Sequence, residues 1–131
     1  VVEEGWGTIT GSDIHNNAHS GIAILSGGDP TVRNCHIHDG KGSGVYVEEG
    51  WGTITGSDIH NNAHSGIAIL SGGDPTVRNC RIHDGKQEGV RMNQGRGTIT
   101  RCDIYHNAGD SITIEAGGSP TVQDCRILDG K

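Results

Sequence analysis

Carboxylate, imidazole and amide side chains crowd into one short stretch of the sequence, GSDIHNNAH, which occurs twice, 45 residues apart. In each copy an aspartate and a histidine stand two residues apart, as Asp13 with His15 and as Asp58 with His60. Side chains of these types at this spacing serve as metal ligands or as an acid–base pair. An active site brings different groups to one reactive position, so an identical second copy favours a repeated surface over a catalytic centre.

A long internal duplication accounts for the second copy. Residues 2–41 match residues 47–86 at every position except one, where Arg81 replaces His36. A third, more divergent unit follows. This near-identity indicates a recent duplication or an engineered repeat. We expect a single domain over residues 1–131, made of three units of about residues 1–44, 45–89 and 90–131.

Each unit contains two related halves with the pattern of short β-strands. In the first half, Ile22 and Ile24 alternate with a small residue, and Gly, Asn, Ser and Asp separate the apolar pieces. No segment has the length or the period of a helix. The sequence therefore predicts an all-β fold, a parallel β-helix or solenoid with six coils of 22–23 residues. The coils begin at or near Thr8, Thr31, Thr53, Thr76, Thr98 and Thr121.

Equivalent residues of successive coils are expected to stack in columns about 4.8 Å apart. One predicted core column contains Ile9, Val32, Ile54, Val77, Ile99 and Val122. A second contains Ile14, Ile37, Ile59, Ile82, Ile104 and Ile127. A third inward column of small residues contains the four cysteines, which lack CxxC spacing and which we expect to be reduced thiols: Ser12, Cys35, Ser57, Cys80, Cys102 and Cys125.

The pattern T-[IV]-x-x-[NSC]-x-I-x-x-[NG]-x-x-x-G-[IV]-x-[IV], which recurs along the chain with small departures, resembles the right-handed parallel β-helix repeat. That repeat occurs in pectate-lyase-like proteins and in the CASH domains of carbohydrate-binding proteins and sugar hydrolases. The stretches GDPTVRNCRIHDGKQEGV and GRGTITRCDIYHNAGDSITI look particularly similar to the β-helix of the F-box-only ubiquitin-ligase substrate adaptor and its prokaryotic relatives. The resemblance covers the whole chain and implies a right-handed β-helix. It leaves the function open, because such proteins include lyases, epimerases, binding modules and adaptors.

Two outward columns flank the inward Ile of each Asp-Ile-His segment. Imidazole beside carboxylate is a ligand set for zinc, copper or nickel. We expect the repeat to have copied one outward histidine whose rings stack in water, with no required cofactor and with metal binding only adventitious. A functional metal site is the alternative, and its candidate ligands are His15, His38, His60, His83, Asp13 and His36.

Acid–base residues outside the duplication occur only in the third unit. They are Tyr105, His106, Asp103 and Asp110. We expect them to be surface residues and the protein not to be an enzyme. A degraded polysaccharide lyase or epimerase is the alternative, because the enzymes that share this fold assemble a unique cleft from such groups.

A tryptophan between two glycines is predicted to lie at an exposed corner beside carboxylates. An exposed tryptophan there suits the stacking of a sugar or a protein contact. From the sequence we favour the other interpretation, in which each tryptophan folds back as a lid over the apolar edge of its coil. The residues of this predicted binding corner are Glu3, Glu4, Trp6, Glu48, Glu49 and Trp51.

The charge pattern limits the partners. The formal net charge is −6 at pH 7 and the basic residues do not cluster, which argues against nucleic acid. No apolar run is long enough to span a membrane and no signal peptide is visible, so we expect a soluble protein of undetermined location. We predict a non-catalytic repeat scaffold that self-associates end to end through uncapped coils. The alternatives are a carbohydrate-binding module and a protein-substrate adaptor.

Overall fold

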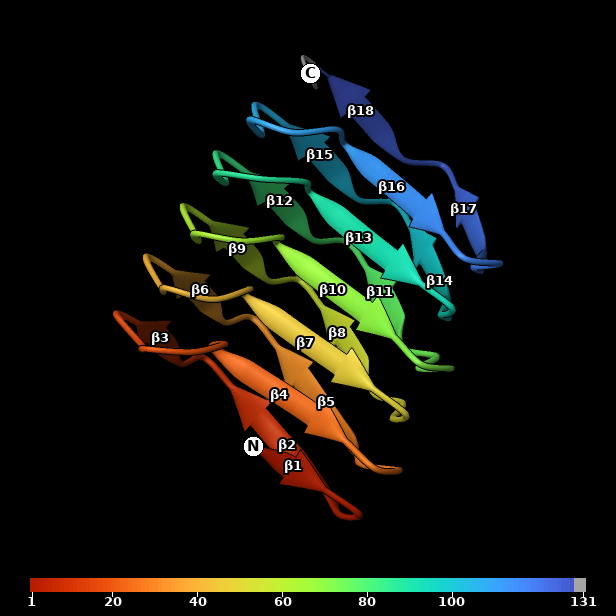
Figure 1. Cartoon of the computed structure of the whole chain (residues 1–131). Helices are drawn as coiled ribbons and strands as arrows, with labels where there is room; N and C mark the ends of the chain where they lie inside the picture. Colours follow the sequence, from red (N-terminus) through yellow and green to blue (C-terminus); the bar gives the residue numbers. More distant parts are fainter. Residues whose placement is uncertain (129–131) are drawn as a thin grey trace.

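The computed structural model describes residues 1–128, which form a solenoid of six coils (Figure 1). Each coil adds one short strand to each of three parallel sheets, which follow the long axis of the molecule. The residues in this range form no helix. The predicted all-β parallel solenoid is confirmed. No helix that could cross a bilayer occurs in the described chain.

The eighteen strands alternate between the sheets in chain order. Sheet A contains β1 (Val2–Glu3), β4 (Ile22–Leu25), β7 (Val45–Glu48), β10 (Ile67–Leu70), β13 (Val90–Asn93) and β16 (Ile112–Glu115). Sheet B contains β2 (Trp6–Thr10), β5 (Asp29–Arg33), β8 (Thr53–Thr55), β11 (Thr76–Arg78), β14 (Arg96–Thr100) and β17 (Ser119–Gln123). Sheet C contains β3 (Asp13–His15), β6 (His36–His38), β9 (Asp58–His60), β12 (Arg81–His83), β15 (Asp103–Tyr105) and β18 (Arg126–Leu128).

The strand register places the predicted core columns as expected. In sheet C, Ile59 pairs with Ile37 on one side and with Ile82 on the other, and all three are fully buried. Ile54 is likewise paired with Val32 and Val77 in sheet B. Parallel pairing brings equivalent residues side by side, and branched side chains of one size fill the narrow interior.

A residue in the left-handed region follows each of the first five strands of sheet C. The backbone φ angle at these positions is 51–56°. Asn and Asp adopt this conformation more readily than most residues, which explains why they predominate there. The turn also directs their side chains back toward the preceding ring, a feature that organises the outer face of the sheet. The five residues are Asn16, Asp39, Asn61, Asp84 and His106.

In the turns that follow, buried asparagines join the third coil to the second and the fifth coil to the fourth. The Asn62 Oδ1 atom accepts a hydrogen bond from the backbone N–H of Gly40 at 3.1 Å, and its Nδ2 donates to the carbonyl of Ile37 at 3.2 Å. Asn107 makes the corresponding bonds two coils later. The sequence pattern alone marks these residues only as turn formers, whereas the structure shows a buried amide that satisfies backbone groups of the preceding coil.

The four cysteines are free thiols in the inward column of small residues. The Cys80 Sγ–H donates to the carbonyl of Arg78 at 3.2 Å. The hydrogen bond with Cys80, together with burial, raises the pKa of Cys102 far above its ordinary value. The same contact lowers the pKa of Cys80. A thiol that stays protonated is a poor nucleophile, so Cys102 acts as a small apolar filler.

Candidate functional site

The outer face of sheet C carries an unbroken stack of rings. Because neighbouring strands are in register, His15, His38, His60, His83 and Tyr105 lie one above another. Their ring centroids are 4.7–5.2 Å apart and their planes differ by no more than 11°. The predicted outer column of histidines is therefore present.

Histidines of the second and fourth coils are held between two carboxylates. The His38 Nε2 atom lies 2.7 Å from Asp13 Oδ1, and its Nδ1 lies 2.5 Å from Asp39 Oδ2. His83 makes the same pair of contacts, with Asp58 and Asp84. The hydrogen bond to Asp39, against a smaller opposing effect of burial, raises the pKa of His38, and the bond to Asp13 adds to the rise.

Histidines of the first and third coils have a different partner. His60 Nδ1 lies 2.7 Å from the amide oxygen of Asn61, and His15 is paired in the same way with Asn16. The difference comes from the sequence, where the residue after each histidine alternates between Asn and Asp. An amide oxygen only accepts, so it receives the Nδ1–H and leaves the other ring nitrogen of His60 with a lone pair.

Three potential ligand atoms converge between the second and third coils. One atom each from His36, Asp58 and His60 lies within 4.8 Å of the other two. Arg81 Nη2 and His83 Nε2 donate to the two oxygens of Asp58, at 2.8 and 2.6 Å. Burial acts against ionisation of Asp58, but these two hydrogen bonds outweigh it and lower the pKa of the carboxyl.

The structure therefore divides the six predicted metal ligands. His36 and His60 converge, whereas His38 and Asp13 bind each other, His83 binds Asp58 and Asp84, and His15 lies in the first coil. Asp58 was not among the predicted ligands, although it is the copy of Asp13 in the second unit. A signal was available, because stacking places Asp58 beside His36 in its own column and next to the column that contains His60.

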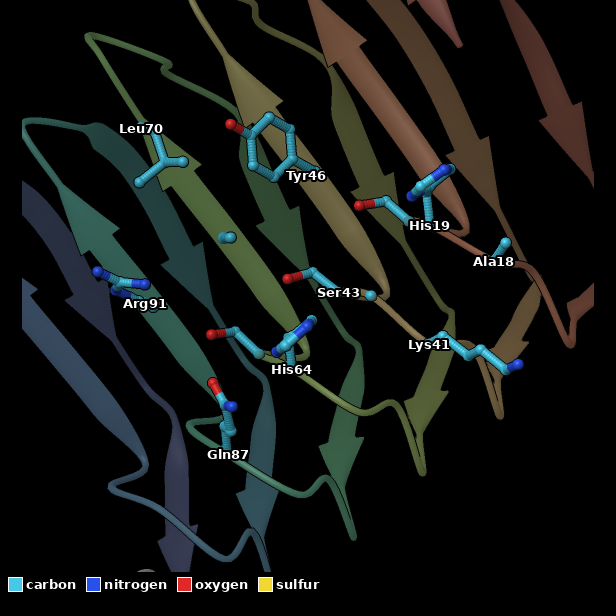
Figure 2. Close-up of a pocket in the computed structure, with 13 residues that line it drawn as sticks. Ala18, His19, Lys41, Ser43, Tyr46, His64, Leu70, Gln87 and Arg91 are labelled. Atoms are coloured by element: carbon cyan, nitrogen blue, oxygen red, sulfur yellow. The ribbon is translucent and has the colours of Figure 1, made fainter.

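A shallow groove of about 490 Å³ follows the outer face of sheet A, and sequence patterns did not reveal it. Figure 2 shows side chains from successive coils along it, with Tyr46 and Arg91 on the strands and His19, His64 and Gln87 in the turns. No Asp or Glu lines the groove among the described residues. Its available signal was the outward strand positions, which carry large polar residues between core valines and methionine.

Two charged contacts border the groove. Arg91 Nε donates to Glu115 Oε1 at 3.1 Å, and Ser65 Oγ donates to Glu88 Oε1 at 3.1 Å. Burial and the negative charge of Glu48 raise the pKa of Tyr46, so its phenol stays neutral. The groove thus combines a neutral aromatic ring with exposed cationic and imidazole side chains.

A family comparison agrees with this geometry. The model of the right-handed β-helix region matches residues 1–131. The chain belongs to the right-handed β-helix family. Comparisons with curated proteins and with solved structures gave no match.

The β-helix presents both tryptophans at one corner, at the start of sheet B. Trp6 is 87% exposed, so it is not a lid over its coil, and Trp51 is 53% exposed. They lie two coils apart, and Asp29 pairs with Trp6 in the coil between them. Glu4 and Glu49 lie in the exposed turns before them, whereas Glu3 and Glu48 are the last residues of β1 and β7 in sheet A.

The four acid–base residues of the third unit do not share one hollow of the β-helix. Asp103 and Tyr105 line a depression of about 220 Å³ together with Arg81 and Arg126. His106 packs edge-on against Tyr105, and Asp110 lies in the exposed turn before β16. A catalytic set requires groups that reach one reacting atom, and these residues are spread over two columns and a turn.

Proposed function

We propose that this β-helix is a non-catalytic binding scaffold that holds an extended, negatively charged ligand in the groove over sheet A. The observation that carries the proposal is the lining of the groove. Among the described residues, the lining contains Lys41, Arg91, His19 and His64 but no Asp or Glu, although the net charge of the chain is −6. Glu88 and Glu115 lie at its border, so the attraction for an anionic ligand comes from the cationic side chains inside the groove.

The repetition of the lining favours a polymer. His19 and His64 are equivalent residues of the first two units, so the same side chain recurs two coils along the groove. Repeat proteins use such periodic surfaces to bind extended ligands. Tyr46 adds an aromatic face on which a sugar ring can stack. Together with the resemblance to carbohydrate-binding β-helices, this supports an acidic oligosaccharide as the ligand.

Calorimetric titration with an oligogalacturonate tests the proposal, and a neutral cello-oligosaccharide serves as the comparison ligand. We expect binding of the acidic oligomer only, with no cleavage products. Lys41→Ala combined with Arg91→Ala should weaken binding by about tenfold or more, because each charged hydrogen bond contributes about 1.5–3 kcal/mol. Lys86→Ala is the matched control, since Lys86 is the copy of Lys41 outside the groove lining. Equal binding of both oligomers, or product formation, contradicts the proposal.

The tryptophan corner supports a second candidate, in which a neutral glycan stacks on Trp6 and Trp51. Its supporting observation is the exposure of both indoles on one corner. A glycan-array comparison of wild type with Trp6→Ala/Trp51→Ala separates the two surfaces. Binding that depends on the indoles but not on Lys41 assigns the ligand to the corner, and binding indifferent to them rejects this candidate.

End-to-end association is a further proposal for the chain of 131 residues. In the last strand of each sheet, the side chains of Ile114, Val122 and Ile127 are 37–50% exposed, although they belong to inward columns. The sixth coil resembles the second, and the first coil is nearly identical to the third. A second copy placed on the sixth coil would therefore repeat the contact between coils two and three. Such head-to-tail contact extends without closing.

A further inference from the structure

We propose that His36, Asp58 and His60 form a binding site for a divalent transition-metal ion of the zinc type. The site lies on the outer face of sheet C, apart from the groove over sheet A, and does not depend on the proposed function. His36 and Asp58 are direct partners in the register of β6 and β9. His60 completes the set from the same strand as Asp58. Two imidazoles and a carboxylate are a common ligand set for zinc.

His60 has the arrangement that a metal-binding imidazole needs. Its Nδ1–H donates to Asn61 Oδ1 at 2.7 Å, so Nε2 carries the lone pair. The rings of His38 and His83 stack on its two faces, with centroid distances of 4.8 and 5.1 Å, and so fix the orientation of the His60 ring. Ring orientation and tautomer are therefore set before an ion arrives.

The neighbouring histidines are unsuited to bind the ion. His38 and His83 each have both nitrogens within hydrogen-bond distance of carboxylate oxygens. Both nitrogens of each ring are thus engaged by carboxylate oxygens, and neither ring is open to an ion. The alternation of Asn61 and Asp84 therefore separates an open ring from an engaged ring along one column.

Asp58 is oriented by its other neighbours. Arg81 and His83 donate to its two oxygens, and each carboxylate oxygen has a second lone pair free for an ion. Partners of this kind fix metal ligands in many sites. A hollow of about 340 Å³ opens beside Asp58 and His36, with room for the ion and a water ligand.

Small movements close the site. A tetrahedral ion with bonds of about 2.1 Å holds its ligands about 3.4 Å apart. The three atoms lie within 4.8 Å of one another, so they must approach by roughly an ångström. The His36 side chain is exposed and its ring makes no hydrogen bond among the described residues, so the ring can rotate to supply that movement.

The duplication itself supplies a matched variant. Arg81 stands where the second unit would repeat His36, and Tyr105 stands where the third unit would repeat His60. The combination of ligands therefore occurs once, between coils two and three. His36→Arg reproduces the second unit's own residue in an equivalent backbone position, so this variant is expected to fold.

Calorimetric titration of the chain with zinc alone tests the site, with ring signals of the histidines followed by NMR. We expect one zinc ion per chain and the largest shifts at His36 and His60. His36→Arg should lower the affinity at least tenfold, and His15→Ala, which removes a stacked histidine outside the site, should leave it unchanged. Absence of one-to-one binding, an unchanged affinity in His36→Arg, or an equal loss in His15→Ala overturns the proposal.

Discussion

His38 Nε2 and Asp13 Oδ1 lie 2.7 Å apart and join the second coil to the first through side chains on the outer face of sheet C. A further contact of 2.5 Å joins His38 to Asp39. The histidine therefore stands between two carboxylates in the folded chain and loses both on unfolding. The contribution of this trio (His38, Asp13 and Asp39) to the stability of the fold therefore depends on pH.

The trio should stabilise the fold most between about pH 4 and pH 6.5, the ordinary ranges of aspartate and histidine. The pKa of His38 is raised, so its contribution is complete below the ordinary histidine value and is lost as pH rises through the raised value. The pKa values of Asp13 and Asp39 are lowered, chiefly by the bonds to His38, so their contribution is lost as pH falls through the lowered values. Urea unfolding at pH 5.5 and 8.5 measures the change.

His38→Gln is the test variant for this pH dependence. The difference in unfolding free energy between wild type and variant should be larger at pH 5.5 than at pH 8.5. His15→Gln is the control, because the side-chain hydrogen bond of His15 is to an amide and not to a carboxylate. An equal difference at both pH values for His38→Gln contradicts the assignment.

Position within a core column should set the cost of truncation. Ile59 is fully buried between two coils, whereas Ile127, in the same column, is 47% exposed. We expect Ile59→Ala to lower the unfolding free energy by about 2–5 kcal/mol. Ile127→Ala should cost less than about half as much, because part of its surface is already in water. Equal losses in chemical denaturation would show that the last coil is packed as tightly as the middle ones.

The buried amide of Asn62 should matter more than its copy in the first coil. Asn62→Ala leaves the backbone N–H of Gly40 without its partner and should cost about 1–3 kcal/mol. Asn17→Ala is the matched control, since no preceding coil offers it such a bond in the described chain. Hydrogen exchange at Gly40 gives a local readout, and unchanged protection there in Asn62→Ala rejects this explanation.

Association through the last coil should respond to a single charge. In the chain of 131 residues we expect the mass measured by light scattering to rise with concentration. Val122→Asp places a carboxylate on the exposed end of a core column and should restore the monomer. Thr55→Asp, on the outer face of sheet B in a middle coil, is the comparison. A wild-type monomer at every concentration ends the proposal.

The fold was predictable from the sequence because the same pattern of residues recurs at a nearly constant interval along the chain. The positions of Ile59 and its column follow from counting residues between copies, and the register confirmed them. The partners of the outer histidines were not predictable in this way. They depend on a left-handed residue, Asn61 or Asp84, that turns a side chain back onto the preceding ring. The groove over sheet A was missed for a similar reason, because Tyr46 and Arg91 come together only when strands of different coils lie side by side.

The cross-coil pairs of Asp13 with His38 and of Asp58 with His83 limit how the molecule can change its length. Loss or gain of a whole 45-residue unit leaves each of these charged neighbours in place, so the rod becomes shorter or longer with its surface intact. Removal of the second coil alone would instead take His38 away from Asp13 and place Asp13 beside Asp58 on the same face. Natural or laboratory variation in length is therefore expected to proceed in steps of two coils.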